Sequence, residues 1–210
     1  MFAFFAGLAA GLLHVFSGPD HLAAIAPLAL SERSADQVRR TRVEGWRTGL
    51  QWGVGHTAGV LLIATLLLFI KEQLPLDAIS AYSERIVGLS LIAIGGWGIR
   101  GAWVRGCEGT GVHRHSHAGA SFAMGTIHGL AGSSHLFGVL PALAFAERAD
   151  SILYLCGFGA GAVVGMCAFA AGIGLLSLRL GRNHPHHYRG LLYASSAAAL
   201  VVGGFWLVGR

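Results

Sequence analysis

Apolar residues run along the chain in six long stretches, separated by shorter segments in which polar and charged residues gather. A helix needs about 20 mainly apolar residues to cross a bilayer. The stretches predict an all-α integral membrane protein with six transmembrane helices, at 2–30, 49–70, 82–104, 119–147, 151–178 and 190–209. The first and fourth are longer than a span requires, so each can tilt or break. The Gly18-Pro19 pair favours a break in the first, because proline lacks the N–H that continues a helix.

Two of these stretches repeat each other. Residues 11–27 read GLLHVFSGPDHLAAIAP and residues 125–141 read GTIHGLAGSSHLFGVLP, at a constant offset of 114. Six of seventeen positions are identical, namely Gly11/Gly125, His14/His128, Gly18/Gly132, His21/His135, Leu22/Leu136 and Pro27/Pro141. We therefore predict two repeats, 1–104 and 119–210, each with three spans and joined by a loop at 105–118. Three is odd, so the second repeat enters the membrane from the opposite side, and the 3+3 repeat is inverted, as in many transporters.

The composition agrees with a membrane protein. The chain is 54% hydrophobic and 12% charged, whereas soluble domains carry about 25% charged residues. Its 32 glycines fit close helix packing in lipid. They also give a weak second match between repeats, Gly53 and Gly55 with Gly157 and Gly159. The net charge of +5 is not arranged as a basic face interleaved with aromatic residues, so we expect no nucleic-acid partner.

The basic residues predict an orientation. Eleven arginines lie in, or beside, the loops that follow the first, third and fifth spans, and four basic residues lie on the opposite side. Lysine and arginine accumulate in cytoplasmic loops. We expect these loops to be cytoplasmic, both termini to lie outside, and the protein to be a multi-pass protein of a bacterial cytoplasmic (inner) membrane.

Ionisable side chains within the predicted spans are the candidate chemistry, because such groups are costly in a membrane and usually serve a function. His14 and His21 are seven residues apart, about 10 Å along an unbroken helix, and a break between them would bring them closer. Asp20 is the only acidic residue well inside any of the predicted spans. A divalent cation beside it would keep its carboxylate ionised. Alternatively, Asp20 caps the helix after Pro19 and the histidines are hydrogen-bonded core residues. His128 and His135 repeat the histidine pair in the fourth span.

His56, in the sequence GVGHTAG early in the second span, has two interpretations: a further ligand or gate, or a packing histidine. A site of imidazole and carboxylate without thiolate favours nickel or cobalt, with zinc not excluded. A second group in the loop, His113, His115 and His117, forms a His-rich tract of the kind that captures metals. It is accessory in our interpretation, and a solvated polar loop is the alternative.

The motifs HVFSGPDHLAAIAP and HGLAGSSHLFGVLP resemble the nickel/cobalt permease superfamily, in particular its short urease-accessory-type members. The resemblance covers most of the chain. It implies movement of Ni²⁺ or Co²⁺ across the bacterial cytoplasmic membrane and assigns a metal role to His14, Asp20 and His21. The better-studied permeases carry His-x4-Asp-His, whereas here the spacing is one residue longer and includes a proline.

We thus expect a transporter of divalent transition-metal ions, with uptake as the expected direction because of the resemblance and the cytoplasmic histidines. Efflux through the same site and a haem-binding membrane redox protein are the alternatives. We expect no enzyme activity, since H-E-x-x-H and Walker A motifs are absent from the sequence. We expect no prosthetic group either. The expected partners are the metal ion and the lipid bilayer, with a homo-oligomer or a cytoplasmic metallochaperone left open.

Overall fold

The computed structural model describes residues 1–31, 45–70, 76–107, 118–131, 134–181 and 185–208, and within these ranges it contains eight helices and no strand. The first four helices are α1 (Phe2–Ser17), α2 (Pro19–Ser31), α3 (Gly45–Ile70) and α4 (Leu76–Cys107). The last four are α5 (Ala118–Ala131), α6 (Ser134–Ala144), α7 (Arg148–Gly181) and α8 (Pro185–Val208). The all-helical prediction is confirmed for the described residues.

The first predicted span is broken at Gly18. Helices α1 and α2 meet there at an angle of 73°. Gly18 adopts an extended backbone conformation, with φ −90° and ψ 100°, and its N–H closes α1 by donating to the carbonyl of His14. Pro19 then begins α2, where its missing N–H costs nothing. The fourth predicted span also consists of two helices, α5 and α6.

Three helical segments are long and apolar enough to cross a membrane, Glu84–Val104, Arg148–Leu180 and His186–Val208. The count rises to four when α1 and α2 are taken as one bent span. The described residues therefore have the apolar helices of a membrane protein. They do not by this measure reach the six spans expected from the sequence, since α3 and the pair α5–α6 are not among these segments.

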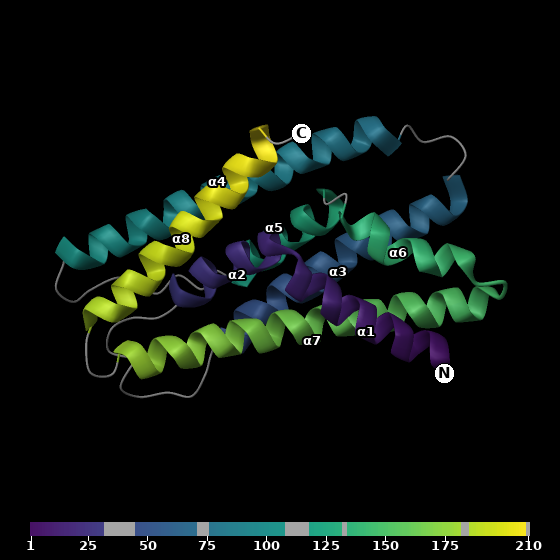
Figure 1. Cartoon of the computed structure of the whole chain (residues 1–210), viewed down its shortest axis with the longest axis horizontal. Helices are drawn as coiled ribbons and strands as arrows, with labels where there is room; N and C mark the ends of the chain where they lie inside the picture. Colours follow the sequence, from purple (N-terminus) through teal and green to yellow (C-terminus); the bar gives the residue numbers. More distant parts are fainter. Residues whose placement is uncertain (32–44, 71–75, 108–117, 132–133, 182–184, 209–210) are drawn as a thin grey trace.

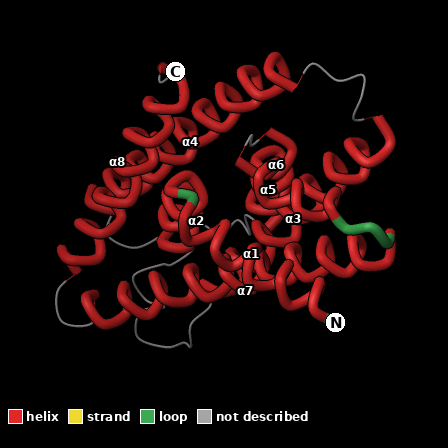
Figure 2. Tube along the Cα trace, turned by 45° about the vertical axis from the view of Figure 1, so that its right-hand side comes forward, coloured by secondary structure: helices red, strands yellow, loops and turns green. Residues whose placement is uncertain are grey.

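The helices pack in pairs that lie far apart in sequence. Helix α1 lies along α7, α3 lies along α5, and α4 lies along α8 (Figure 1). Helices α3 and α7 also pack against each other. Seen from a second direction, α4 and α8 form one side of the molecule and α1 and α7 another, with α2, α3, α5 and α6 between them (Figure 2). Helix α2 and the helices α5 and α6 thus lie between these two sides.

Glycines allow the α1–α7 and α3–α5 pairs to approach until their backbones touch. A Cβ on Gly11 would overlap the carbonyl oxygen of Phe158, and one on Gly161 would overlap that of Leu8. In the α3–α5 pair, a Cβ on Gly125 would overlap the carbonyl of Trp52, and one on Gly55 that of Phe122. Such small-residue contacts are how helices associate closely in lipid.

The two pairs are equivalent. Gly11 and Gly125 are repeat partners at the offset of 114, and so are Leu8 and Phe122. The residues that they contact on α7 and α3 also correspond, at an offset of 106. Phe158 of α7 matches Trp52 of α3, and Gly161 of α7 matches Gly55 of α3. At this offset, three glycines of α3 align with three of α7, namely Gly53, Gly55 and Gly59 with Gly159, Gly161 and Gly165. The match expected from the sequence pairs Gly53 and Gly55 with Gly157 and Gly159, at an offset of 104. That alignment of α3 with α7 is therefore shifted by two residues from the one in the structure.

Side chains from α7 and α8 satisfy carbonyls of the short helices. Tyr154 donates its hydroxyl to the carbonyl of Gly138 at 2.9 Å, and Ser151 donates to the carbonyl of Ala142 at 2.7 Å, both in α6. Near the end of α2, the Leu30 carbonyl accepts a hydrogen bond from the hydroxyl of Tyr188 in α8. The last four carbonyls of a helix lack intrahelical partners, so the bonds to Ala142 and Leu30 stabilise the ends of α6 and α2.

Candidate metal centre

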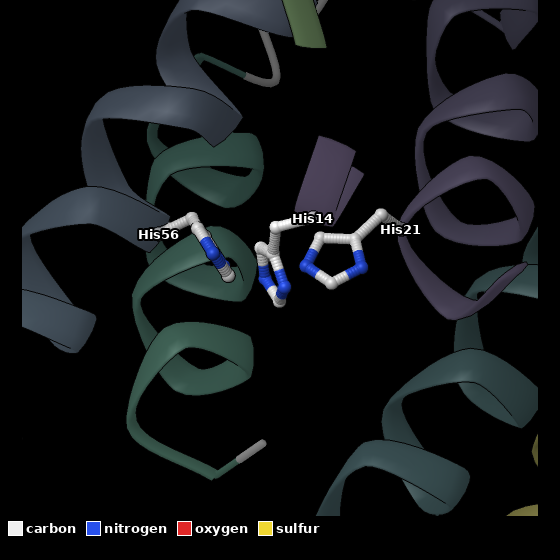
Figure 3. Close-up of side chains that lie close together, drawn as sticks. All are labelled: His14, His21 and His56. Atoms are coloured by element: carbon white, nitrogen blue, oxygen red, sulfur yellow. The ribbon is translucent and has the colours of Figure 1, made fainter. Parts of the chain in front are cut away.

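Four imidazoles and one carboxylate converge in the interior from four helices. His14 comes from α1, Asp20 and His21 from α2, His56 from α3 and His128 from α5. His21, His56 and His128 are fully buried and Asp20 is 2% exposed, whereas His14 is partly exposed. Figure 3 shows His14 between His21 and His56, with the three rings gathered at one point. The structure thus brings five of the six predicted in-span site residues together.

The break at Gly18 brings His14 and His21 together. On a straight helix two residues seven apart would be separated by about 10 Å along the axis. With the bend, their ring centroids are 4.7 Å apart and their planes meet edge to face at 80°. Gly18 is required at this corner, because a Cβ there would overlap Nδ1 of His21 and press on Oδ1 of Asp20.

His56 enters the cluster from α3. Its ring centroid lies 4.9 Å from that of His21 and 5.8 Å from that of His14. The close packing of α5 on α3 sets its position, since a Cβ on Gly129 would overlap the carbonyl oxygen of His56. Of the two interpretations left open by the sequence, the geometry favours membership of the polar cluster over an isolated packing histidine.

Asp20 joins the two repeats. Its Oδ1 lies 3.0 Å from Nδ1 of His21, and its Oδ2 lies 3.0 Å from Nε2 of His128. The residue stands in the first turn of α2, where the helix dipole stabilises a negative charge. Helix capping alone therefore does not account for the contacts of Asp20, because its carboxylate also contacts an imidazole in each repeat.

Two overlapping sets of three side chains have the spacing of metal ligands. One set is His14, His21 and His56, and the other is Asp20, His21 and His128. In each set, one ligand atom per residue lies within 4.8 Å of the others. Nitrogen ligands bind zinc-like ions at about 2.0–2.1 Å, which spaces neighbouring ligands roughly 3–4 Å apart. Small side-chain movements would therefore close either set around an ion, and His21 belongs to both.

An aromatic side chain packs against the centre in each repeat. Trp52 of α3 lies with its ring centroid 5.7 Å from that of His128, and Phe158 of α7 lies 5.4 Å from His14. Both aromatic residues are buried. Trp52 and Phe158 are equivalent at the offset of 106, just as His14 and His128 are at 114. The predictions from the sequence do not include this pair. The match of three glycines between α3 and α7 at the offset of 106 would have aligned Trp52 with Phe158.

The remaining predicted residues are not placed. His135 belongs to α6, but its side chain lies outside the described part of the chain. His113, His115 and His117 fall in 108–117, also outside the described residues. Their expected roles, as a sixth in-span ligand and as accessory metal capture, stay predictions.

Comparisons with known proteins give three relatives. The Arabidopsis thaliana proteins named Chloroplast protein FOR GROWTH AND FERTILITY 2 and 1 are 36% and 34% identical to the chain, over 94% of it in both cases. The alignments cover 54% and 56% of those proteins, so the chain spans about half the length of these plant relatives. Urease accessory protein UreH of Bacillus sp. (strain TB-90) is 29% identical over 85% of this chain and 80% of its own length. No family model and no solved structure match the chain.

Proposed function

We propose that this protein carries divalent transition-metal ions, Ni²⁺ or Co²⁺, across a membrane through the His/Asp centre. The observation that supports this function best is the convergence of four imidazoles and one carboxylate inside a bundle of apolar helices. Buried charges are unfavourable unless they are paired or coordinate a metal. A site of nitrogen and oxygen ligands without thiolate suits first-row divalent ions, zinc among them.

The proposal includes six spans in two inverted repeats, with α1–α2 and α5–α6 as broken spans. The equivalent packing of α1 on α7 and of α5 on α3 supports this architecture. Helices α3 and α7 cross in opposite directions, since Gly45 lies against Ala170 whereas Thr57 donates to the carbonyl of Gly159. Broken helices that meet at the repeat interface are where transporters bind substrate.

The choice of ion and family rests on similarity. The motif resemblance points to the nickel/cobalt permeases, and one relative is named a urease accessory protein. These two similarities support our proposal that the chain is a relative of that family. The plant relatives are named chloroplast proteins, so the bacterial inner membrane as location rests on the resemblance and on the arginine asymmetry.

Uptake is the proposed direction, with the His-rich segment 113–117 receiving the ion on the cytoplasmic side. The chain acts as a carrier and not as an enzyme, and the metal is its cargo. A homo-oligomer or a metallochaperone would be an additional partner in this scheme. Efflux would use the same centre, and it is distinguished by comparing vesicles of the two orientations.

Metal flux into proteoliposomes tests the function. Purified protein should accumulate Ni²⁺ or Co²⁺ above protein-free vesicles, and His14→Ala should reduce the initial rate by about tenfold or more because it removes a candidate ligand. His186→Ala is the matched control, since His186 is an exposed histidine at the start of α8, and its flux should equal that of the wild type. Equal flux in both variants would show that the His/Asp centre does not carry the ion.

A further inference from the structure

We propose that the cation is held by the three imidazoles of His14, His21 and His56, and that Asp20 is a positioning residue that does not coordinate it. The proposal rests on the proposed function and assigns separate roles within the centre. The two candidate ligand sets share His21, so one ion can occupy only one of them, and the proposal says which. The contacts of the Asp20 carboxylate decide between them.

Both oxygens of Asp20 are engaged by imidazoles. The 3.0 Å distances to Nδ1 of His21 and Nε2 of His128 are those of N–H···O hydrogen bonds. An ion bound to His21 and His128 through these same nitrogens would displace their protons and so break both bonds. The set of His14, His21 and His56 can close around an ion while both bonds to Asp20 persist.

The contact with Asp20 also sets the tautomer of His21. A carboxylate accepts hydrogen bonds, so Nδ1 of His21 carries the proton, and in the neutral ring Nε2 then carries the lone pair. Figure 3 shows one ring nitrogen of His21 directed toward His14 and the other directed away from it. Metal-binding histidines commonly donate their second nitrogen to a carboxylate, which orients the ring and raises its basicity. Asp20 and His21 have this arrangement.

The expected site is therefore a face of three imidazoles with open coordination positions. A three-ligand site keeps room for water or for an incoming ligand, as in metal sites that exchange ligands. His128 belongs to the surroundings of the site in this scheme, because it reaches the ion only through Asp20. That makes the role of His128 distinct from the role of His14, although the two are repeat partners.

Pulsed electron paramagnetic resonance of bound Cu²⁺ tests the assignment by counting coordinated imidazoles. The background variant replaces the seven histidines outside the centre by glutamine, namely His113, His115, His117, His135, His184, His186 and His187, so that added Cu²⁺ reports the centre. We expect three imidazoles in this background, two after His14→Ala or His56→Ala, and three after His128→Ala. A count that falls with His128→Ala and not with His56→Ala would overturn the proposal.

Asp20 variants give the second measurement. Asp20→Asn keeps an oxygen that accepts from Nδ1 of His21, so we expect three imidazoles and about 10–100-fold weaker Cu²⁺ binding. Asp20→Ala should bind more weakly than Asp20→Asn if the residue positions His21. Equal losses in the two variants, with an altered ligand count, would make Asp20 a ligand. A background protein that binds no Cu²⁺ at the centre would count against the proposed function as well.

Trp52 and Phe158 lie at opposite sides of the centre, and this placement carries a separate inference. Along the antiparallel crossing of α3 and α7, Gly53 lies against Val163 and Thr57 reaches Gly159. Phe158 of α7 is therefore at the height of the residue that follows Thr57 on α3. Trp52 lies five to six residues before that height on α3, which is roughly 8 Å along the helix axis. His56 lies between these two levels, and each aromatic ring packs on a histidine of the centre.

We infer that Trp52 and Phe158 are the two barriers that separate the centre from the two sides of the membrane. A buried apolar ring on each side hinders passage of a hydrated ion, and movement of one ring at a time would open one side. The repeat relation between the two residues predicts equal and opposite effects. Replacing Trp52 should expose the centre to the side reached by the Gly45 end of α3, and replacing Phe158 should expose it to the other side.

Sided labelling tests the barriers without metal. In a His56→Cys variant with Cys107, Cys156 and Cys167 replaced by alanine, a membrane-impermeant maleimide is added to right-side-out or inverted vesicles. We expect Trp52→Leu to increase labelling from one side and Phe158→Leu to increase it from the other, by about tenfold. Leucine keeps the positions apolar, and thermal unfolding verifies that each variant folds. Increased labelling from the same side in both variants, or in neither, would overturn the inference.

Discussion

Replacing His21 by alanine should lower the affinity for Ni²⁺ by about 100-fold or more and abolish flux. His21 belongs to both candidate ligand sets, so no arrangement of the remaining side chains replaces it. Its loss also removes one of the two hydrogen-bond donors to the buried carboxylate of Asp20, which costs about 1–3 kcal/mol of folding free energy. Equilibrium dialysis of the purified protein measures the affinity, and thermal unfolding measures the stability.

His21→Gln separates the two effects. A glutamine amide donates a hydrogen bond to Asp20, so this variant should recover part of the stability but little of the affinity for metal. An affinity within threefold of the wild type in either variant would remove His21 from the centre. Leu13→Ala, a neighbouring change at an exposed position on α1, should leave both quantities unchanged.

Gly129→Ala should destabilise the protein by about 1–3 kcal/mol, because the added methyl group must displace the backbone of α3 at His56. The same displacement moves the His56 ring, so metal affinity should fall together with stability. Gly11→Ala should destabilise to a similar degree, since it presses on the carbonyl of Phe158 in the equivalent helix pair. Thermal unfolding and metal titration of the same preparations measure both effects.

Two other glycines provide the controls. Gly96 and Gly172 lie in helices α4 and α7, and a Cβ at either position meets nothing within 4 Å. Alanine is the better helix former by about 1 kcal/mol, so Gly96→Ala and Gly172→Ala should be neutral or stabilising. If these variants lost as much stability as Gly129→Ala, helix packing through glycine would not explain the fold.

The local features of the fold could be predicted from the sequence. The apolar helices, the break at Gly18-Pro19 and the approach of His14 to His21 follow from residue types and their spacing. The six spans expected from the sequence are not all found, since α3 and the pair α5–α6 are not among the segments that are long and apolar enough to cross a membrane. The register of α3 on α7 depends on which glycine faces which carbonyl, and a glycine-rich sequence allows several alignments, so the offset of 104 was wrong.

The site could be predicted less completely than the helices. The repeated histidines nominate ligands, yet the partners of Asp20 depend on how two distant helices, α2 and α5, meet. Nothing in the spacing of Asp20 and His128, 108 residues apart, indicates the contact between them. Trp52 and Phe158 are apolar residues in apolar segments, so their place beside the histidines emerges from tertiary packing.

The offset of 106 aligns His56 with Ala162, which is fully buried, so one repeat contributes an imidazole where the other contributes a methyl group. In the proposed carrier, two identical inverted repeats would make the inward-open and outward-open conformations equal in free energy. His56 corresponds to Ala162, and Asp20 corresponds to Ser134 in the other repeat. These differences would make the free energies of the two conformations unequal. The empty form of this proposed carrier would therefore have a preferred resting orientation, to which these two polar differences between the repeats contribute.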